Sequence, residues 1–82
     1  TKDRLTFKEK YLLQTLPDEI EALQVKISSI EQRLSNMALF NEQPETYQKL
    51  AREVEDLIEQ REQKEQSWLD LAIRLEELGE KL

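Results

Sequence analysis

Hydrophobic residues recur along this chain at alternating spacings of three and four, which is typical of helices that bury one face. The first series runs through Ile20, Leu23, Ile27, Ile30, Leu34 and Met37. The second series has the same spacing and comprises Tyr47, Leu50, Val54, Leu57, Arg61, Lys64, Trp68, Leu71, Leu75 and Leu78. Both series are heptad seams, which predict two long helices packed as a coiled coil.

A capping pattern and two prolines set the expected ends of the helices. Thr6 followed by Glu9 matches a capping box, so a short helix should begin there and stop or kink before Pro17. Pro17 and Pro44 each suit the first turn of a following helix. The expected elements are helices at about 7–15, 17–38 and 44–78, with a tip loop at about 39–43.

Reversal at the tip loop pairs positions whose numbers sum to about 84, such as Ile30 with Val54. The expected fold of residues 1–82 is therefore a single all-α domain, an antiparallel coiled-coil hairpin with the short first helix packed at its base. The last helix carries a broad apolar stripe, made of Trp68, Leu69, Leu71, Ala72, Ile73 and Leu75. This stripe needs more than one neighbour, so we expect the first helix to cover it and to bury most of Trp68.

Two cations interrupt the second seam, and they allow two interpretations. Arg61 and Lys64 can lay their methylene groups along the seam while their charged heads reach Glu19 or water, an arrangement that penalises wrong registers. Alternatively, the two cations form part of an anion-binding surface near the base, which requires them to be exposed.

Composition limits the chemistry available to the chain. Its 82 residues include one Gly, two Pro, no Cys and no His, and 37% of them are charged. The chain thus lacks thiolates and the commonest metal ligand and general base, and a reducing cytoplasm is its expected location. Its many carboxylates are expected to solvate helix faces, so we predict no catalytic residue and no metal site. No apolar run reaches about eighteen residues, so no membrane span is expected.

The opening of the chain differs in charge from the remainder. Residues 1–10 hold four basic and two acidic side chains, whereas residues 11–82 hold eight basic and sixteen acidic ones. The opening therefore has a net charge of +2 within a chain whose net charge is -6. A local basic patch can meet phosphates despite an overall negative charge. The candidate nucleic-acid contacts are Arg4, Lys8 and Lys10, with Phe7 and Tyr11 either stacking on an unpaired base or packing against Trp68.

The order of several motifs carries a family resemblance. LTFKEKYLLQTLPDEIEALQVKISSIEQRL (residues 5–34) precedes a polar and aromatic tip, and REQKEQSWLDLAIRLEEL (residues 61–78) completes the last helix. This order resembles the C-terminal coiled-coil domain of Uup-type ABC-F ATPases. The residues that carry the resemblance are Leu5, Thr6, Phe7, Lys8, Glu9, Leu16, Pro17, Phe40 and Trp68.

The resemblance implies a parent protein with two upstream ATP-binding cassettes, which use ATP and Mg. Members of this family are soluble ATPases without membrane domains, and many act on the translating ribosome. The C-terminal domain of the Uup-like branch is associated with DNA binding. The start of the chain at Thr1 in place of Met agrees with a segment of such a longer protein. The leading expectation is a non-catalytic DNA-binding accessory domain, with ribosomal RNA or the ribosome as other possible targets.

Two other functions remain open at the level of sequence. The hairpin is alternatively a protein-interaction or spacer arm that contacts the ribosome or the parent's cassettes, with Phe40 either stapling the tip or touching a partner. It also has a seam for weak self-association if the first helix leaves that seam uncovered, although a monomer is expected.

Overall fold

A computed structural model describes residues 4–79 of the chain. Three helices occur in this range: α1 (Phe7–Leu34), α2 (Met37–Glu42) and α3 (Pro44–Leu78). No strand is present among the described residues. The prediction of an all-α protein is confirmed.

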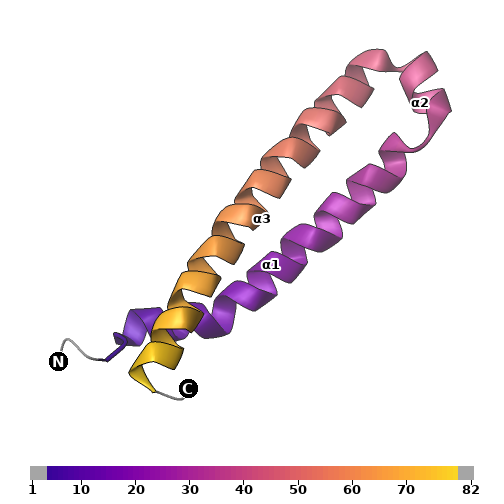
Figure 1. Cartoon of the computed structure of the whole chain (residues 1–82). Coiled ribbons are helices and arrows are strands. Elements are labelled where there is room, and N and C mark those ends of the chain that lie inside the picture. Colours follow the sequence, from indigo (N-terminus) through magenta and orange to yellow (C-terminus); the bar gives the residue numbers. More distant parts are fainter. Residues whose placement is uncertain (1–3, 80–82) are drawn as a thin grey trace.

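The two long helices lie side by side and run in opposite directions, and α2 turns the chain between them (Figure 1). The molecule is accordingly elongated, with extents of 59 × 17 × 15 Å. We call the end that holds α2 the tip (residues 35–47). The opposite end, where α1 begins and α3 finishes, is the base (residues 4–17 and 68–79).

Local chemistry accounts for both ends of α3. Pro44 occupies its first turn, where the missing N–H of proline costs no helical hydrogen bond. Gly79 ends the helix with a φ of 67° in the left-handed region, and its amide donates to the carbonyls of Leu75 and Glu76. Glycine adopts this conformation without the steric penalty that a side chain would impose.

The tip differs from the expected loop at 39–43 because a second cap starts a helix there. α1 ends at Leu34, and Asn36 then caps α2 by accepting a hydrogen bond from the Ala38 amide at 3.0 Å. Met37, expected in the first seam, is the first residue of α2 and is 68% exposed. The second helix thus ends earlier than the expected residue 38, and a short helix replaces most of the loop.

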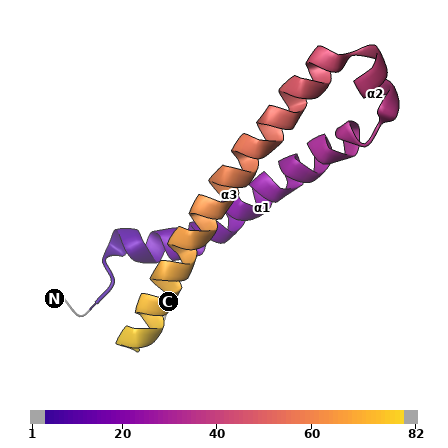
Figure 2. The ribbon, with the colours of Figure 1, turned by 45° about the horizontal axis from the view of Figure 1, so that its top comes forward.

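α1 is continuous across Pro17, where the sequence allowed either a stop or a kink and the expected bounds gave separate helices at 7–15 and 17–38. Pro17 cannot donate to the carbonyl of Leu13, yet Leu13, Leu16 and Leu23 are all buried on either side of it. Since one buried face runs through the proline, helix packing outweighs the lost hydrogen bond. The helix nevertheless bends. Figure 2 shows that the first part of α1 crosses α3 obliquely and does not lie along it.

A cluster of buried side chains lies in the half of the molecule nearer the tip, while Leu5, Leu13, Leu16 and Leu23 are also buried, nearer the base. Ile27 and Ile30 of α1 pack with Leu50 and Val54 of α3, and Ile27 is only 1% exposed. Partly buried apolar residues surround this cluster: Leu34, Leu39, Leu57 and Ile58. Burial of these side chains is the main favourable term holding the long helices together.

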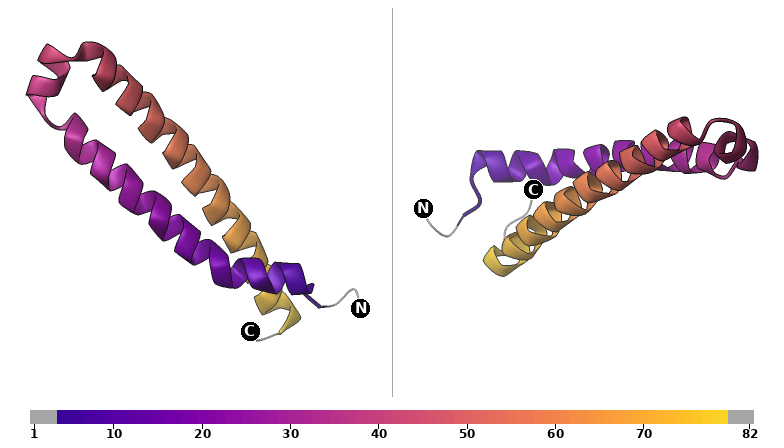
Figure 3. Two further views of the ribbon diagram at one scale, coloured as in Figure 1. Left: turned by 180° about the vertical axis from the view of Figure 1, so that it is seen from behind. Right: turned by 90° about the horizontal axis from the view of Figure 1, so that it is seen from above.

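The base is less covered than the sequence suggested. Trp68, expected to be mostly buried, is 37% exposed, and Leu69 and Ile73 are 46% and 45% exposed. Viewed from above, the early part of α1 and the last turns of α3 diverge (Figure 3). Because α1 crosses α3 at an angle here, it covers only part of the broad α3 stripe.

Candidate nucleic-acid interface

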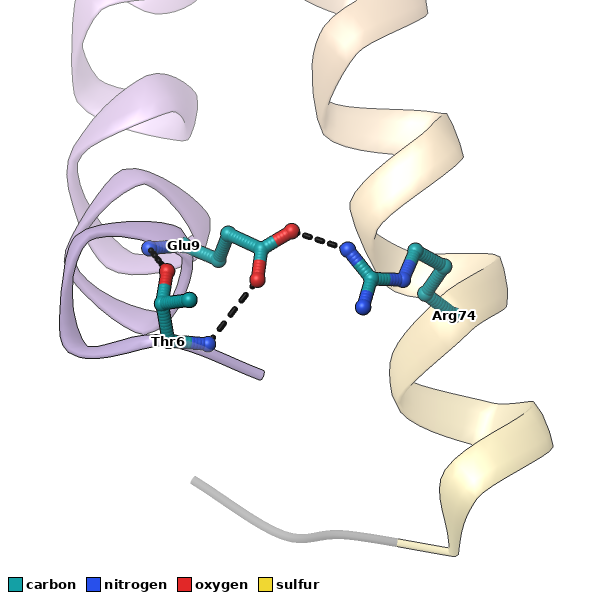
Figure 4. A network of polar contacts seen from close by, with 3 residues as sticks. All are labelled: Thr6, Glu9 and Arg74. Atoms are coloured by element: carbon teal, nitrogen blue, oxygen red, sulfur yellow. Dashed lines mark hydrogen bonds and ion pairs between the residues drawn. The ribbon is translucent and has the colours of Figure 1, made fainter. Parts of the chain in front are cut away.

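Thr6 and Glu9 fix the first turn of α1 and tie it to α3. The Glu9 amide donates to the Thr6 hydroxyl at 3.1 Å, and the Thr6 amide donates to Glu9 Oε1 at 2.8 Å. This is the capping box that the sequence indicated. The second carboxylate oxygen, Oε2, accepts a hydrogen bond from the guanidinium of Arg74 in α3 (Figure 4). One carboxylate therefore closes the helix end and anchors it across the base.

These contacts lower the pKa of Glu9 from its ordinary value of 4.5. The largest cause is the hydrogen bond from the Thr6 backbone, which favours the ionised carboxylate, whereas desolvation opposes it. The Thr6 side chain and the nearby Arg74 charge lower the pKa further. Glu9 thus acts as a fixed anion that orients the start of α1.

The side chains that follow the cap include two exposed aromatic rings. Phe7 is 87% exposed and Tyr11 is 58% exposed, so neither packs into the base as one of the two interpretations expected. The buried face of this segment is instead formed by Leu5, Leu13 and Leu16. Aromatic rings held in water are available for contact with a ligand.

The candidate cations near these rings differ in exposure. Arg4 and Lys8 are exposed, whereas Lys10 is half-buried. With Glu9 as the one acidic side chain of residues 4–11, this segment has a net charge of +2. The base thus brings a small positive surface and two aromatic rings together on the first turns of α1.

Arg61 and Lys64 do not belong to this surface, because both are engaged between the helices. Lys64 Nζ lies 2.7 Å from Glu19 Oε1, which confirms the expectation that its head reaches Glu19. Arg61 donates to the side-chain oxygen of Gln24 and pairs with Glu65, with 3.4 Å between Nε and Oε1. Their side chains are only 24% and 34% exposed, so the exposure that an anion-binding role requires is not met.

Phe40 at the tip both packs against a neighbouring ring and stays partly exposed, so it is compatible with each of the two roles that the sequence left open. The Phe40 and Tyr47 rings meet edge to face, with centroids 5.1 Å apart and planes at 83°. This contact staples α2 onto the start of α3. Phe40 is nevertheless 51% exposed, so part of its ring remains available at the tip.

Two features of the base were not predicted from the sequence: the role of Arg74 and a groove beside Trp68. Arg74 was detectable in principle, since Glu9 and Arg74 satisfy the register sum of about 84 that pairs the two long helices. The groove is lined by Pro17, Ile20, Glu65, Trp68 and Leu69. It depends on the bend in α1. Pro17 indicated a stop or a kink, but the heptad pattern does not predict the direction of the bend.

The described part of the chain contains neither a cluster of possible metal ligands nor a helix that could span a membrane. Within residues 4–79, no three or more His, Cys, Asp or Glu side chains form a group that could hold a metal ion. In the same range, no helix combines the length and apolar character needed to cross a membrane.

Comparison with known protein families gives one match. A family model described as ABC transporter C-terminal domain matches residues 4–72, which include the basic and aromatic start, all of α1, the tip and α3 as far as residue 72. Searches of curated proteins and of solved structures found no match to the chain. The family match covers most of the 82 residues, and the chain therefore belongs to the ABC transporter C-terminal domain family.

Proposed function

We propose that this chain is a non-catalytic nucleic-acid-binding accessory domain of an ABC protein, with DNA as its leading ligand. The observation that carries the proposal is the exposure of Phe7 and Tyr11 beside the cations of the same helix end. The two long helices form an antiparallel coiled-coil arm in this proposal, and the base is its contact surface. The ATP and Mg chemistry belongs to the cassettes of the parent protein.

The spacing of the aromatic residues suits contact with unpaired bases. Phe7 and Tyr11 are four residues apart, so they lie on the same face of α1, and Lys8 follows Phe7 directly. Bases stack on such rings regardless of sequence, while nearby cations meet the phosphates. This chemistry favours single-stranded over duplex DNA, because the bases of a duplex are already stacked on one another.

The charge balance sets the expected strength of binding. Arg4, Lys8 and Lys10 can neutralise few phosphates, and the remainder of the chain is acidic. For a single strand, three neutralised phosphates give a slope of about -2 in a plot of log affinity against log salt concentration. Binding is therefore expected to be weak and to fall as salt rises.

The shape of the molecule favours a second candidate function, that of a spacer or protein-interaction arm. The molecule is 59 Å long, and Phe40 is exposed at the end remote from the base. An arm of this kind would present its tip to the ribosome or to the parent's cassettes. It predicts loss of partner binding on Phe40→Ala and no salt-dependent affinity for DNA.

Fluorescence anisotropy with labelled single-stranded DNA, duplex DNA and structured RNA across a salt series tests the leading proposal. The test variant is Lys8→Glu with Lys10→Glu, which removes positive charge from the base. The matched control is Lys26→Glu with Lys49→Glu, which changes the net charge equally at two exposed lysines away from the base. Phe7→Ala isolates the contribution of stacking.

The proposal predicts binding to single-stranded DNA that weakens with salt, is lost in the base variant and persists in the control. Phe7→Ala should weaken binding by about 1 to 3 kcal/mol, the usual value of one stacked base. Equal loss in both charge variants would show general attraction without a site. No binding to any probe at low salt, with helicity intact, would overturn the proposal.

A further inference from the structure

A shallow apolar groove of about 420 Å³ lies between α1 and α3 where the two helices begin to diverge. Pro17 and Ile20 form its α1 side, and Trp68 and Leu69 form its α3 side. Trp68 and Leu69 each keep more than a third of their surface in water. Exposed tryptophan next to aliphatic side chains is typical of the anchor regions of protein interfaces.

The exposed apolar surface continues along α3 within the base, toward the end of the helix. Ile73 is four residues after Leu69, on the same face of the helix, and is 45% exposed. The stripe is therefore longer than the groove and runs along its α3 wall. A surface of this form suits a third helix that places residues at i, i+3 or i+4, and i+7 against it.

The border of the groove is acidic. Glu65 lines the groove, and its other lining residues have acidic neighbours in the sequence: residues 18, 19 and 21 lie beside Pro17 and Ile20, and Glu62 and Asp70 lie near Trp68 and Leu69. Two cations in this part of α3 already have carboxylate partners, since Lys64 pairs with Glu19 and Arg61 with Glu65. The border therefore has excess negative charge, which favours a cationic occupant.

We infer that the groove is a docking site for a basic amphipathic helix, whose apolar anchors pack on Trp68 and Leu69 while its Lys or Arg residues face the acidic border. A second copy of this chain that docked through the same face is a poor occupant, because it would bring the same acidic border. A nucleic acid is repelled for the same reason. This site is separate from the nucleic-acid surface proposed for residues 4–11.

The test uses the fluorescence of Trp68, the one tryptophan in the chain, as its readout. The probe is a synthetic peptide of about five helical turns, with Leu at i, i+3, i+4 and i+7 and Lys on both flanks. Controls are a scrambled peptide of the same composition and the patterned peptide with Glu in place of Lys. A single-stranded DNA oligonucleotide is titrated in parallel.

The inference predicts a saturable blue shift of Trp68 emission with the patterned Lys peptide. Leu69→Glu should weaken its affinity at least about tenfold, because a charge replaces an apolar anchor. Met37→Glu, which places the same charge on an exposed apolar residue at the tip, should leave the affinity unchanged. The Lys8→Glu and Lys10→Glu variant should also retain peptide binding, which separates this site from the proposed nucleic-acid surface.

A second variant covers the case in which Leu69→Glu disturbs the fold. Glu21→Lys changes an exposed border position and should weaken peptide binding about threefold. The inference is overturned by equal binding of the scrambled peptide, by unchanged affinity in Glu21→Lys, or by no shift with any peptide. A DNA-induced shift that Leu69→Glu abolishes would also overturn it and assign the groove to nucleic acid.

Discussion

Glu9 shows how one side chain links local structure to packing. Its carboxylate completes the cap with Thr6 through one oxygen and reaches Arg74 of α3 through the other. The cap sets where α1 begins, and the ion pair sets where that beginning lies relative to α3. The exposed rings at Phe7 and Tyr11 follow directly from this placement.

The lowered pKa of Glu9 predicts a pH-dependent stability. A group whose pKa is lower in the folded than in the unfolded protein stabilises the fold above its unfolded pKa, here 4.5. That contribution is lost as the pH falls through the lowered folded pKa. Glu9→Gln keeps a capping side chain without the charge, so its melting temperature should lie below that of the wild type at neutral pH. The difference should shrink as the solution is acidified below pH 4.5.

Thermal unfolding followed by circular dichroism across this pH range measures the effect. A difference between the two proteins that stays constant from neutral to acid pH would contradict the assignment to Glu9 ionisation.

Ile27 is the most deeply buried side chain of the core and should contribute most to stability. Ile27→Ala leaves a cavity between the long helices and should lower the free energy of unfolding by about 2 to 5 kcal/mol. Val25→Ala is a suitable control, since Val25 is 63% exposed on the same helix, and its effect should stay within about 0.5 kcal/mol. Urea denaturation of both variants measures the contrast. Equal effects would show that the core does not hold the helices together.

At the scale of elements, the bend at Pro17 decides the form of the base. A proline within a helix removes one hydrogen bond and tilts the segment before it. The tilt directs the start of α1 across α3, where Glu9 meets Arg74, and leaves Trp68 and Leu69 partly uncovered. Both proposed contact surfaces therefore depend on one residue.

Pro17→Ala tests this dependence. Alanine restores the N–H donor to the Leu13 carbonyl, so α1 should straighten and carry Glu9 away from Arg74. The pKa of Glu9 should then rise part of the way toward 4.5, because the Arg74 contribution is lost while the larger Thr6 contribution remains. Titration of the Glu9 side chain by NMR in both proteins measures the change. An unchanged pKa would show that the ion pair does not require the bend.

At the scale of the whole molecule, two kinds of feature were predicted correctly from the sequence. They are helix starts, which depend on neighbouring residues, and pairs of residues set by the seam register. Thr6 and Pro44 mark the starts of helices through their own hydrogen-bonding or backbone properties. The Lys64 contact with Glu19 follows from seam register. Helix continuity across Pro17 could not be predicted locally, because it depends on how much apolar surface α3 buries on both sides.

The candidate site was predicted in its composition and only partly in its geometry. The basic and aromatic start was evident from charge counts, but whether Phe7 and Tyr11 face water or the base depends on the direction of α1. The sequence grouped Arg61 with the candidate cations, whereas the structure engages it between the helices. Charge patterns identify which residues are cationic, and only packing decides which of them are available.

The central claim is that the base, and not the arm or the tip, contacts nucleic acid. The most direct measurement is an NMR titration of the isotope-labelled chain with a single-stranded DNA oligonucleotide at low salt, following every backbone amide. The account predicts concentration-dependent shifts confined to residues 4–11 and the facing turns of α3 near Arg74. Shifts centred on residues 36–47, shifts spread along the arm, or no shifts at all would contradict it.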